Sequence, residues 1–206
     1  MNAKEHWEKV YREKNPTLDV SWYQVRPDTS LRLIQATGIA KDQPVIDVGG
    51  GASSLVDCLL DLAFQDLTVL DISAAALEHA RRRLTLRAKS ITWVEADVTA
   101  FKSAKRFQLW HDRAVFHFLT QTDACRDYVR ALKASLAPDG WLIMATFAKD
   151  GPNRCSGLPV AHYDADTLQT ELGREFKLVE QLHETHVTPW DNEQSFAWFC
   201  FHRVTA

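Results

Sequence analysis

Short apolar segments alternate with longer amphipathic segments through the middle of the chain. The apolar segments predict five successive strands, at 45–48, 67–70, 91–94, 107–110 and 141–147. Periodic apolar positions between them predict helices at 53–64, 74–87 and 123–136. Strands that alternate with helices of this length pair in parallel through right-handed crossovers. The pattern therefore predicts an α/β fold, with a mostly parallel sheet and helices on both of its faces.

The segment before the first strand has two helical patterns joined by an aromatic stretch. Apolar positions at three- and four-residue spacing predict helices over 4–14 and 29–37, and Gly38 follows the second as a glycine C-cap. Trp22 and Tyr23 lie in the stretch that joins them. Two interpretations of these aromatic side chains are open: a lid over a ligand, or an anchor that holds the first helix on the core.

The pattern changes after residue 147. Glycine and proline residues over 149–163 predict a long ordered loop, and a short helix follows at 166–172. Apolar segments at 176–182 and 196–202 are close enough in sequence for a reverse connection, so they predict an antiparallel strand pair at the sheet edge. No repeat, linker or low-complexity segment interrupts the chain, which predicts one domain over 1–206.

Composition and charge narrow the class of protein. The 206 residues are 46% hydrophobic and 25% charged, as in an ordinary globular protein, and the net charge of −3 leaves no electrostatic footprint for general nucleic-acid binding. No apolar run approaches the roughly 18 residues of a membrane span, and the first residues lack the apolar core of a signal peptide. We expect a cytoplasmic protein without nucleic-acid or membrane partners, and a monomer by default.

The cysteines and histidines do not form a metal-binding pattern. Cys58, Cys125 and Cys200 lie in apolar or helical contexts and form no CxxC pair, so buried free thiols are expected. His183 and His186 are three apart in a predicted strand, which places them on opposite faces. No metal site is predicted.

A glycine-rich turn carries the first candidate chemistry. The sequence VIDVGGGASS at 45–54 predicts a strand, a sharp turn and a helix start, as in a nucleotide-binding βαβ unit. No lysine follows the glycines, which excludes a P-loop, and the third glycine of a dinucleotide fingerprint would fall at Ser54. Asp47 would repel a pyrophosphate but attract a cationic amino or sulfonium group. Asp71 ends the second strand and suits a ribose diol.

Three motifs together resemble a known family. DVGGGAS at 47–53, LDIS at 70–73 and EADV at 95–98 resemble the class I S-adenosylmethionine-dependent methyltransferases. The resemblance covers roughly 44–147, and the usual third glycine of the first motif is Ser53 here. It implies a Rossmann-like seven-stranded sheet that is mostly parallel and has a C-terminal antiparallel strand pair. It also implies S-adenosylmethionine as cofactor and methyl transfer as the reaction.

The family's binding roles carry over to matching positions. The resemblance implies that Asp71 accepts hydrogen bonds from the ribose and that Asp97 accepts one from the adenine amine. It implies that the methionine part is held by Asp47, Gly49, Gly50 and Gly51. It also implies that Ile72 and Val98 contact the adenine ring. It divides the chain into a helical lid segment (1–40), a cofactor-binding core (44–147) and a substrate loop with edge strands (148–206).

The end of the fourth strand is the predicted place for acceptor chemistry. There His111 is expected to contact the cofactor through its backbone or ring, with Asp112 or His117 as a base or acceptor-orienting group. Two other interpretations are open: Asp112 and Arg113 as an ion pair at a helix start, and His117 as a core histidine. Cys155, in the loop after the fifth strand, is either a reactive thiol or a packing residue.

The acceptor is predicted by class only. The segments WEKVY…SWYQ and HDRAVFHFL resemble thiopurine- and tellurite-type small-molecule methyltransferases. They also resemble lysine methyltransferases related to the enzyme that acts on citrate synthase. We expect methyl transfer to a small molecule with a thiol, chalcogen or amine acceptor, with a protein lysine as the alternative. A non-catalytic protein that only binds S-adenosylmethionine is disfavoured by the intact acids and the polar strand end.

Overall fold

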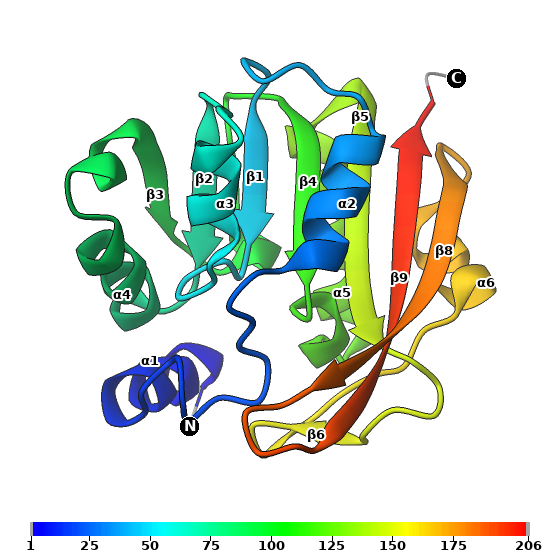
Figure 1. Ribbon diagram of the computed structural model, residues 1–206. Coiled ribbons are helices and arrows are strands. Elements are labelled where there is room, and N and C mark those ends of the chain that lie inside the picture. Colours follow the sequence, from blue (N-terminus) through cyan, green and yellow to red (C-terminus); the bar gives the residue numbers. More distant parts are fainter. Residues whose placement is uncertain (1, 205–206) are drawn as a thin grey trace.

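The computed structural model describes residues 2–204 and is built on a seven-stranded sheet (Figure 1). Its strands are β1 (Val45–Val48), β2 (Leu67–Asp71), β3 (Ile91–Glu95), β4 (Phe107–Arg113), β5 (Leu136–Phe147), β8 (Phe176–Val187) and β9 (Glu193–Arg203). The strand order is β3-β2-β1-β4-β5-β9-β8, and the first five strands are parallel. Strand β9 is antiparallel to both β5 and β8. The predicted mostly parallel sheet with a C-terminal antiparallel pair is confirmed.

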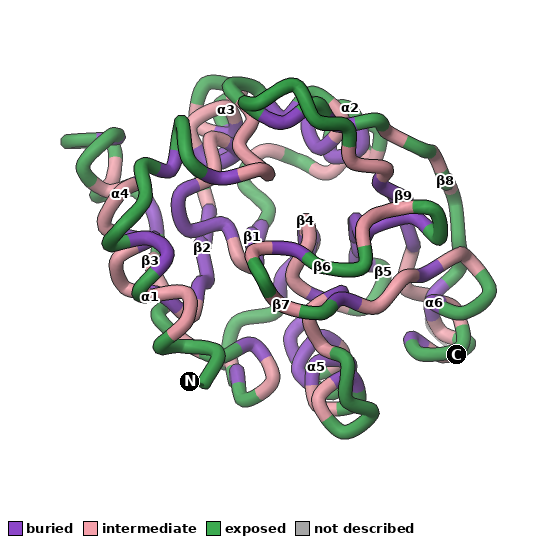
Figure 2. The backbone as a smooth tube through the Cα atoms, turned by 90° about the horizontal axis from the view of Figure 1, so that it is seen from below, coloured by how far each residue is buried: buried purple, intermediate pink, exposed green. Residues whose placement is uncertain are grey.

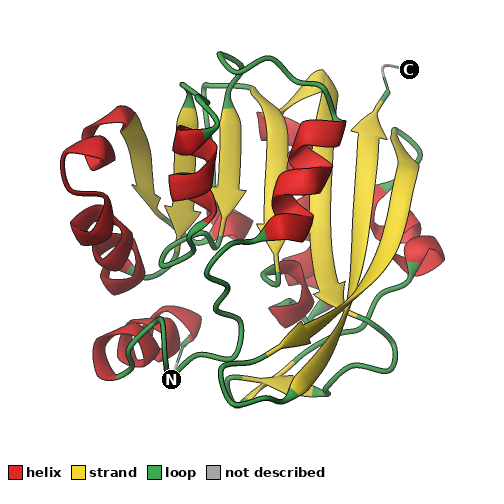
Figure 3. Cartoon of the chain, viewed as in Figure 1, coloured by secondary structure: helices red, strands yellow, loops and turns green. Residues whose placement is uncertain are grey.

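Helices cover both faces of this sheet, as the alternating pattern predicts (Figure 3). They are α1 (Ala3–Glu13), α2 (Asp28–Ala36), α3 (Leu55–Asp61), α4 (Ala74–Leu84), α5 (Thr122–Ser135) and α6 (Ala165–Leu172). The apolar sides of α2, α3 and α4 belong to one buried cluster, and those of α5 and α6 to another. Helix α1 instead lies beyond the ends to which the parallel strands point (Figure 1). Among residues 2–204 no helix has both the length and the apolarity to cross a bilayer.

Successive side chains of each strand enter different layers of the core. Leu109 packs in the layer of α2, α3 and α4, whereas Trp110 packs in the layer of α5 and α6. Ile143 and Leu142 of the neighbouring β5 divide in the same way. All four are fully buried, and burying an apolar side chain of this size stabilises a fold by about 1.5–3 kcal/mol. Continuous apolar strands are therefore the expected result of a sheet covered on both faces.

Two predicted boundaries differ from the structure because of local backbone geometry. The helix predicted over 74–87 ends at Leu84, where Thr85 adopts a φ of 54° and the chain continues as a 3₁₀-helix to Ser90. The strand predicted over 141–147 begins at Leu136 instead, and in this added part the pairing of β4 and β5 shifts register and Asp139 has a φ of 56°. Both places carry a non-glycine residue with positive φ, which a pattern of apolar positions does not reveal.

The two C-terminal strands are longer than predicted, and the outer one is β8. Strand β9 is buried along most of its length, while β8 is largely exposed (Figure 2). An edge strand has only one neighbour in the sheet, so polar and exposed side chains such as His183 and Thr185 are tolerated there. Strand β9, which is antiparallel to both of its neighbours, therefore lies one position inside the sheet, and β8 forms the sheet edge.

Candidate active site

Two cavities lie at the carboxyl ends of the parallel strands. The large cavity has a volume of about 200 Å³ and reaches from the ends of β2 and β3, past β4, to the start of β9. The small cavity, of about 40 Å³, lies between the glycine turn after β1 and the segment that joins α1 to α2. Both are lined by Tyr11, Trp22, Val48, Gly49 and Arg113. The two cavities are therefore adjacent, at the place where an open α/β sheet binds its ligands.

The glycine turn brings the chain close to its neighbours on three sides. Gly49 has a φ of 69°, and a Cβ at this position would collide with the side chain of Val115. A Cβ on Gly51 would lie 2.5 Å from both the Ala76 Cβ and the Asp71 Oδ2. Only glycine fits at these two positions. Gly49 lines both cavities, and Gly50 lines the small one.

Asp71 holds the turn and faces the large cavity. Its Oδ2 accepts a hydrogen bond from the Gly51 N–H at 3.0 Å and its Oδ1 accepts one from the Ser73 N–H at 2.9 Å. The side chain is buried, and this burial raises its pKa to about 6 despite the two donors. Each carboxylate oxygen retains a second lone pair for a ligand.

The predicted adenine-binding residues line the same cavity. Ile72, Asp97 and Val98 all contribute to its wall. The Asp97 Oδ1 accepts hydrogen bonds from the Thr99 N–H at 2.9 Å and the Thr99 hydroxyl at 2.7 Å, so the acid is fixed at the start of a 3₁₀-helix, Val98–Ala100. Structure and sequence agree on the placement of these residues around one cavity.

Asp47 and His111 form a buried pair behind the glycine turn. The Asp47 Oδ1 is 2.7 Å from the His111 Nδ1, and the His111 Nε2 is 3.0 Å from the Ser30 hydroxyl oxygen. Both ring nitrogens of His111 thus have partners, so the expected ring contact to a cofactor is not supported, although the residue lines the small cavity. The Asp47 Oδ2 is buried and has no hydrogen-bond partner. The histidine orients a carboxylate that keeps one free oxygen.

An aromatic cluster joins α1 to the cavity wall. The Trp22 ring packs edge-on to the Trp7 ring at a centroid distance of 5.7 Å and to the Tyr11 ring at 6.3 Å, and Phe118 contacts Trp7 at 5.1 Å. All four residues line the large cavity. Trp22 is therefore both an anchor of α1 and a part of the cavity wall. Tyr23 lines the small cavity.

Polar contacts hold α1 over these cavities. The Glu8 carboxylate accepts hydrogen bonds from the Ala74 N–H at 2.8 Å and the Ala75 N–H at 3.3 Å, which are free donors at the start of α4. The His79 Nε2 is 2.8 Å from the Tyr11 carbonyl oxygen. Helix α1 is thus attached to the helix that follows Asp71.

Arg113 is the site residue that the motif-based prediction did not select. Its Nη1 donates to the Trp22 carbonyl at 2.7 Å, and its guanidinium lies over the Phe196 ring at 5.2 Å. Its Nε and Nη2 are buried without partners, and burial lowers its pKa to about 10. The signal in the sequence is its position two residues after His111, which places both side chains on the cavity side of β4.

Asp112 points away from both cavities, which corrects its predicted role. It is fully buried on the α5 side of the sheet, where its Oδ2 accepts a hydrogen bond from the Tyr128 hydroxyl at 2.5 Å. The Val115 and Phe116 N–H groups donate to the same carboxylate at 2.8 and 3.2 Å. Since successive strand residues face opposite sides, Asp112 forms no ion pair with Arg113 either. Its carboxylate fixes the turn after β4.

His117 is a core histidine. It is fully buried, its Nδ1 accepts a 3.3 Å hydrogen bond from the Phe147 N–H, and its Nε2 has no partner. It lines neither cavity. Burial, which disfavours the charged imidazolium, lowers its pKa to about 3. The predicted role of His117 as a base that contacts the acceptor is not supported by this placement.

The buried His117 predicts a pH dependence of stability. Its pKa is about 3 in the folded chain and 6.5 in the unfolded one, so as the pH falls through this window only the unfolded chain takes up a proton. The free energy of unfolding then decreases by about 1.4 kcal/mol per pH unit. His117→Gln removes the titrating group, so the free energy of unfolding of the variant should lack this pH dependence. We therefore expect the difference in free energy of unfolding between wild type and variant to shrink by about 2 kcal/mol from pH 7.5 to pH 5.

Urea denaturation of both proteins at the two pH values measures this difference. The variant His183→Gln, at an exposed position, controls for the loss of a histidine as such. Parallel stability curves of the wild type and the His117 variant would contradict the assignment.

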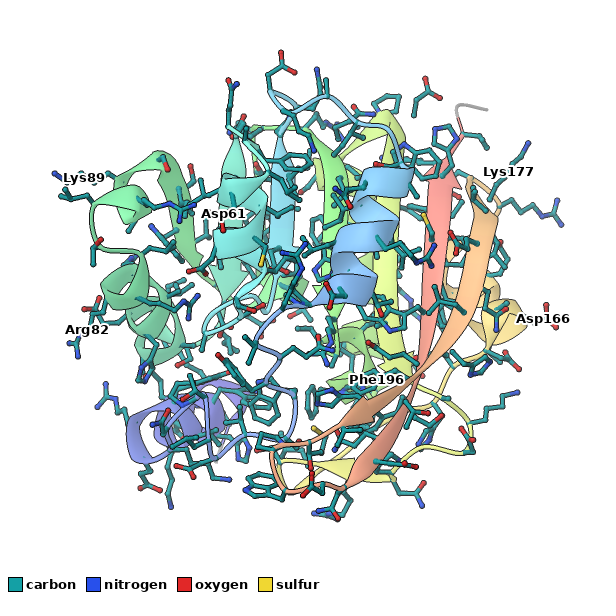
Figure 4. The ribbon with its side chains drawn as sticks, in the orientation of Figure 1. Asp61, Arg82, Lys89, Asp166, Lys177 and Phe196 are labelled. Atoms are coloured by element: carbon teal, nitrogen blue, oxygen red, sulfur yellow. The ribbon has the colours of Figure 1, made fainter. Side chains whose placement is uncertain are left out.

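The far wall of the large cavity comes from the C-terminal third of the chain. The loop 149–163 contains a short hairpin, β6 (Arg154–Cys155) and β7 (Leu158–Pro159), which contributes Cys155 and Leu158. Gln194 and Phe196 come from the start of β9, and Figure 4 shows Phe196 near the lower end of this strand. Burial raises the pKa of the Cys155 thiol to about 11, so a neutral packing residue fits better than a reactive thiolate. All four cysteines of the chain are free.

The comparisons with known proteins agree with this architecture. The family model of Nodulation protein S (NodS) matches residues 8–158, which include the glycine turn and all three acidic motifs. The chain belongs to the NodS family. The resemblance to class I S-adenosylmethionine-dependent methyltransferases is thereby confirmed at the level of the family.

Individual relatives of this NodS-family chain are distant. Nodulation protein S of Bradyrhizobium diazoefficiens is 31% identical over 130 residues, which are 63% of this chain and 60% of that relative. EEF1A lysine methyltransferase 2 of Danio rerio is 26% identical over 160 residues, 71% of this chain and 69% of that protein. The solved 1,6-didemethyltoxoflavin-N1-methyltransferase of Burkholderia thailandensis has a TM-score of 0.75 at 16% identity, with 98% and 87% of the two chains covered. Its structure has 1,6-didemethyltoxoflavin and S-adenosylhomocysteine bound.

Proposed function

We propose that this NodS-family protein transfers the methyl group of S-adenosylmethionine to a small-molecule acceptor. The observation that carries the proposal is the pair of adjacent cavities, with fixed acids at one end and aromatic walls at the other. The structural neighbour that has a small molecule and S-adenosylhomocysteine bound together supports a site that holds an acceptor beside the cofactor.

The cofactor would lie across both cavities. Asp71 would accept hydrogen bonds from the ribose, and Asp97 one from the adenine amine, with Ile72 and Val98 on the two faces of the ring. The methionine part would lie in the small cavity, whose wall includes Asp47, Gly49, Gly50, Tyr23 and His111. The free Asp47 Oδ2 supports this assignment because a buried carboxylate oxygen without a partner suits an ammonium or sulfonium group. Gly51 would shape the turn through its contact with Asp71.

Methyl transfer requires correct positioning of the cofactor and the acceptor more than it requires acid–base groups. The acceptor atom attacks the methyl carbon, the carbon–sulfur bond breaks, and its electron pair stays on sulfur, which becomes a neutral thioether. Closing the site excludes water from this step. Of the described lining residues, the acids Asp71 and Asp97 lie at the nucleotide end, and burial raises the pKa values of Tyr11 and Cys155. Because their pKa values are raised, Tyr11 and Cys155 remain neutral at physiological pH. The wall near the acceptor therefore provides no strong base.

Two measurements test the proposal. Calorimetry with S-adenosylmethionine and S-adenosylhomocysteine measures cofactor binding, and failure to bind either would contradict the cofactor assignment. A transfer assay with tritiated methyl groups then compares a lysate's protein and small-molecule fractions as acceptors. Label in the small-molecule fraction is expected. Label confined to protein would favour the protein-lysine alternative, which the lysine methyltransferase relative supports, and cofactor binding without any label would favour a binding protein.

Localisation, partners and oligomeric state stay predictions from the sequence. A cytoplasmic monomer without nucleic-acid or membrane partners is what the composition and charge indicate. Sedimentation velocity would check the monomer directly.

A further inference from the structure

We propose that Arg113 is an anion receptor in the large cavity and that the methyl acceptor is a small apolar carboxylic acid, bound as its carboxylate. This inference rests on the proposed function, because it names the acceptor class of the same site.

The guanidinium of Arg113 has an unused bidentate edge. Its Nη1 is occupied by the Trp22 carbonyl at 2.7 Å, while its Nε and Nη2 have no hydrogen-bond partner. The Nε–H and an Nη2–H point in the same direction, and this fork matches the two oxygens of a carboxylate. Among residues 2–204, no carboxylate lies within 4.0 Å of the guanidinium. A buried cation without a counter-ion is costly, and a bound anion removes that cost.

The two neighbouring acids form no ion pair with Arg113 in the described chain. Glu184 and Asp47 are near enough to raise the pKa of Arg113, but each has other partners. The Glu184 carboxylate accepts hydrogen bonds from the Trp198 Nε1–H at 2.7 Å and the Thr29 hydroxyl at 2.9 Å. Asp47 is bonded to His111. The positive charge of Arg113 is therefore not neutralised by a contact within the described chain.

The surroundings determine what kind of anion fits. Arg113 is the one basic residue in the described wall of the large cavity. Around it are Phe118, Leu158, Phe196 and the indole rings of α1 and the joining segment, which suit an apolar body. Asp71 and Asp97 lie at the other end and would repel the carboxylate from the nucleotide part. A cationic amine would be repelled by Arg113.

A binding assay in the presence of saturating S-adenosylhomocysteine tests the inference. Benzoate, phenylacetate and 3-phenylpropionate are compared with their neutral amides by calorimetry on the full chain. We expect the acids to bind at least about tenfold more tightly than the amides, as a charge-assisted fork predicts. In Arg113→Met this preference should disappear while the variant, checked by urea denaturation, remains folded. Arg113→Lys, which retains the charge but not the fork, should keep only part of it.

The controls separate the outcomes. Arg32→Met removes an exposed arginine of α2 and should leave the preference for acids intact. Equal binding of acids and amides by the wild type, with S-adenosylhomocysteine bound, overturns the inference and leaves the proposed function standing. The methionine carboxylate of the cofactor is the other source of the same chemistry. If Arg113→Met weakens S-adenosylhomocysteine but not methylthioadenosine, which lacks that carboxylate, the acceptor assignment is overturned.

Discussion

Replacing Asp71 by asparagine should weaken the binding of S-adenosylhomocysteine by about 10- to 100-fold. The carboxylate accepts one backbone N–H on each oxygen and presents its remaining lone pairs to the cavity. Asparagine offers one acceptor oxygen and turns an NH₂ group toward either Gly51 or Ser73, so a donor meets a donor. A lost hydrogen bond to a charged group costs about 1.5–3 kcal/mol, which corresponds to this range of affinity.

Calorimetry at pH 7.5 measures the effect, and a pH series provides a second check. Because the pKa of Asp71 is raised to about 6, the ionised carboxylate is present above this pH and is lost as the pH falls through it. Wild-type affinity should therefore decrease below pH 6, whereas the affinity of Asp71→Asn should be less sensitive. Asp57→Asn, a change in an ion pair of α3 with Arg83, is the matched control. Unchanged binding by Asp71→Asn would remove Asp71 from the cofactor site.

Replacing Asp112 by alanine should destabilise the fold by about 3–5 kcal/mol, the cost of leaving several buried donors without their charged partner. The Tyr128 hydroxyl and the N–H groups of Val115 and Phe116 would all lose their acceptor in the core. Burial raises the pKa of Asp112 to about 6, yet the group is not accessible to an acceptor. The free energy of unfolding in urea at pH 7.5 measures the loss.

Two further variants assign this loss to the network. Tyr128→Phe removes one donor to Asp112 and also the hydroxyl that accepts a hydrogen bond from the Trp110 Nε1–H at 2.9 Å. A double-mutant cycle with Asp112→Ala isolates the pair and should give a coupling energy of about 0.5–3 kcal/mol. Asp112→Asn retains an acceptor oxygen, so its free energy of unfolding should lie between those of the wild type and Asp112→Ala. If Asp112→Asn instead abolishes methyl transfer at unchanged stability and unchanged cofactor binding, a direct role in the chemistry would have to be restored.

The parts of the fold that depend on periodicity could be predicted from the sequence. Strands covered on both faces produce continuous apolar segments such as LIMA at 142–145, and their alternation with helices predicts a mostly parallel sheet. The boundaries depend on individual backbone angles instead. Thr85 and Asp139 both adopt a positive φ, which could not be predicted at these positions from the pattern of apolar residues. The length of β8 was missed because its exposed polar half resembles a loop.

The candidate site divides in the same way. Asp47 precedes the end of β1, Asp71 ends β2 and Asp97 follows the end of β3. Parallel strands bring these ends to one edge, so the strand pattern together with the family resemblance could place all three acids at one site. The residues after β4 could not be assigned by proximity in sequence. His111 and Arg113 face one side and Asp112 the other, which follows from strand alternation once β4 is known to extend to residue 113. Phe196 is 83 residues beyond Arg113, and only the folded sheet brings them together.

The wall of the large cavity combines elements that differ in how freely they can vary. Phe196 belongs to β9, is almost fully buried and packs against Phe147 at a centroid distance of 4.9 Å, so a change there also disturbs the sheet. Leu158 belongs to a two-residue strand of a small hairpin outside the main sheet. Substitutions in this hairpin can alter the shape of the cavity at little cost to folding. Evolution toward a new acceptor, or directed evolution in the laboratory, should therefore begin in the hairpin and reach β9 last.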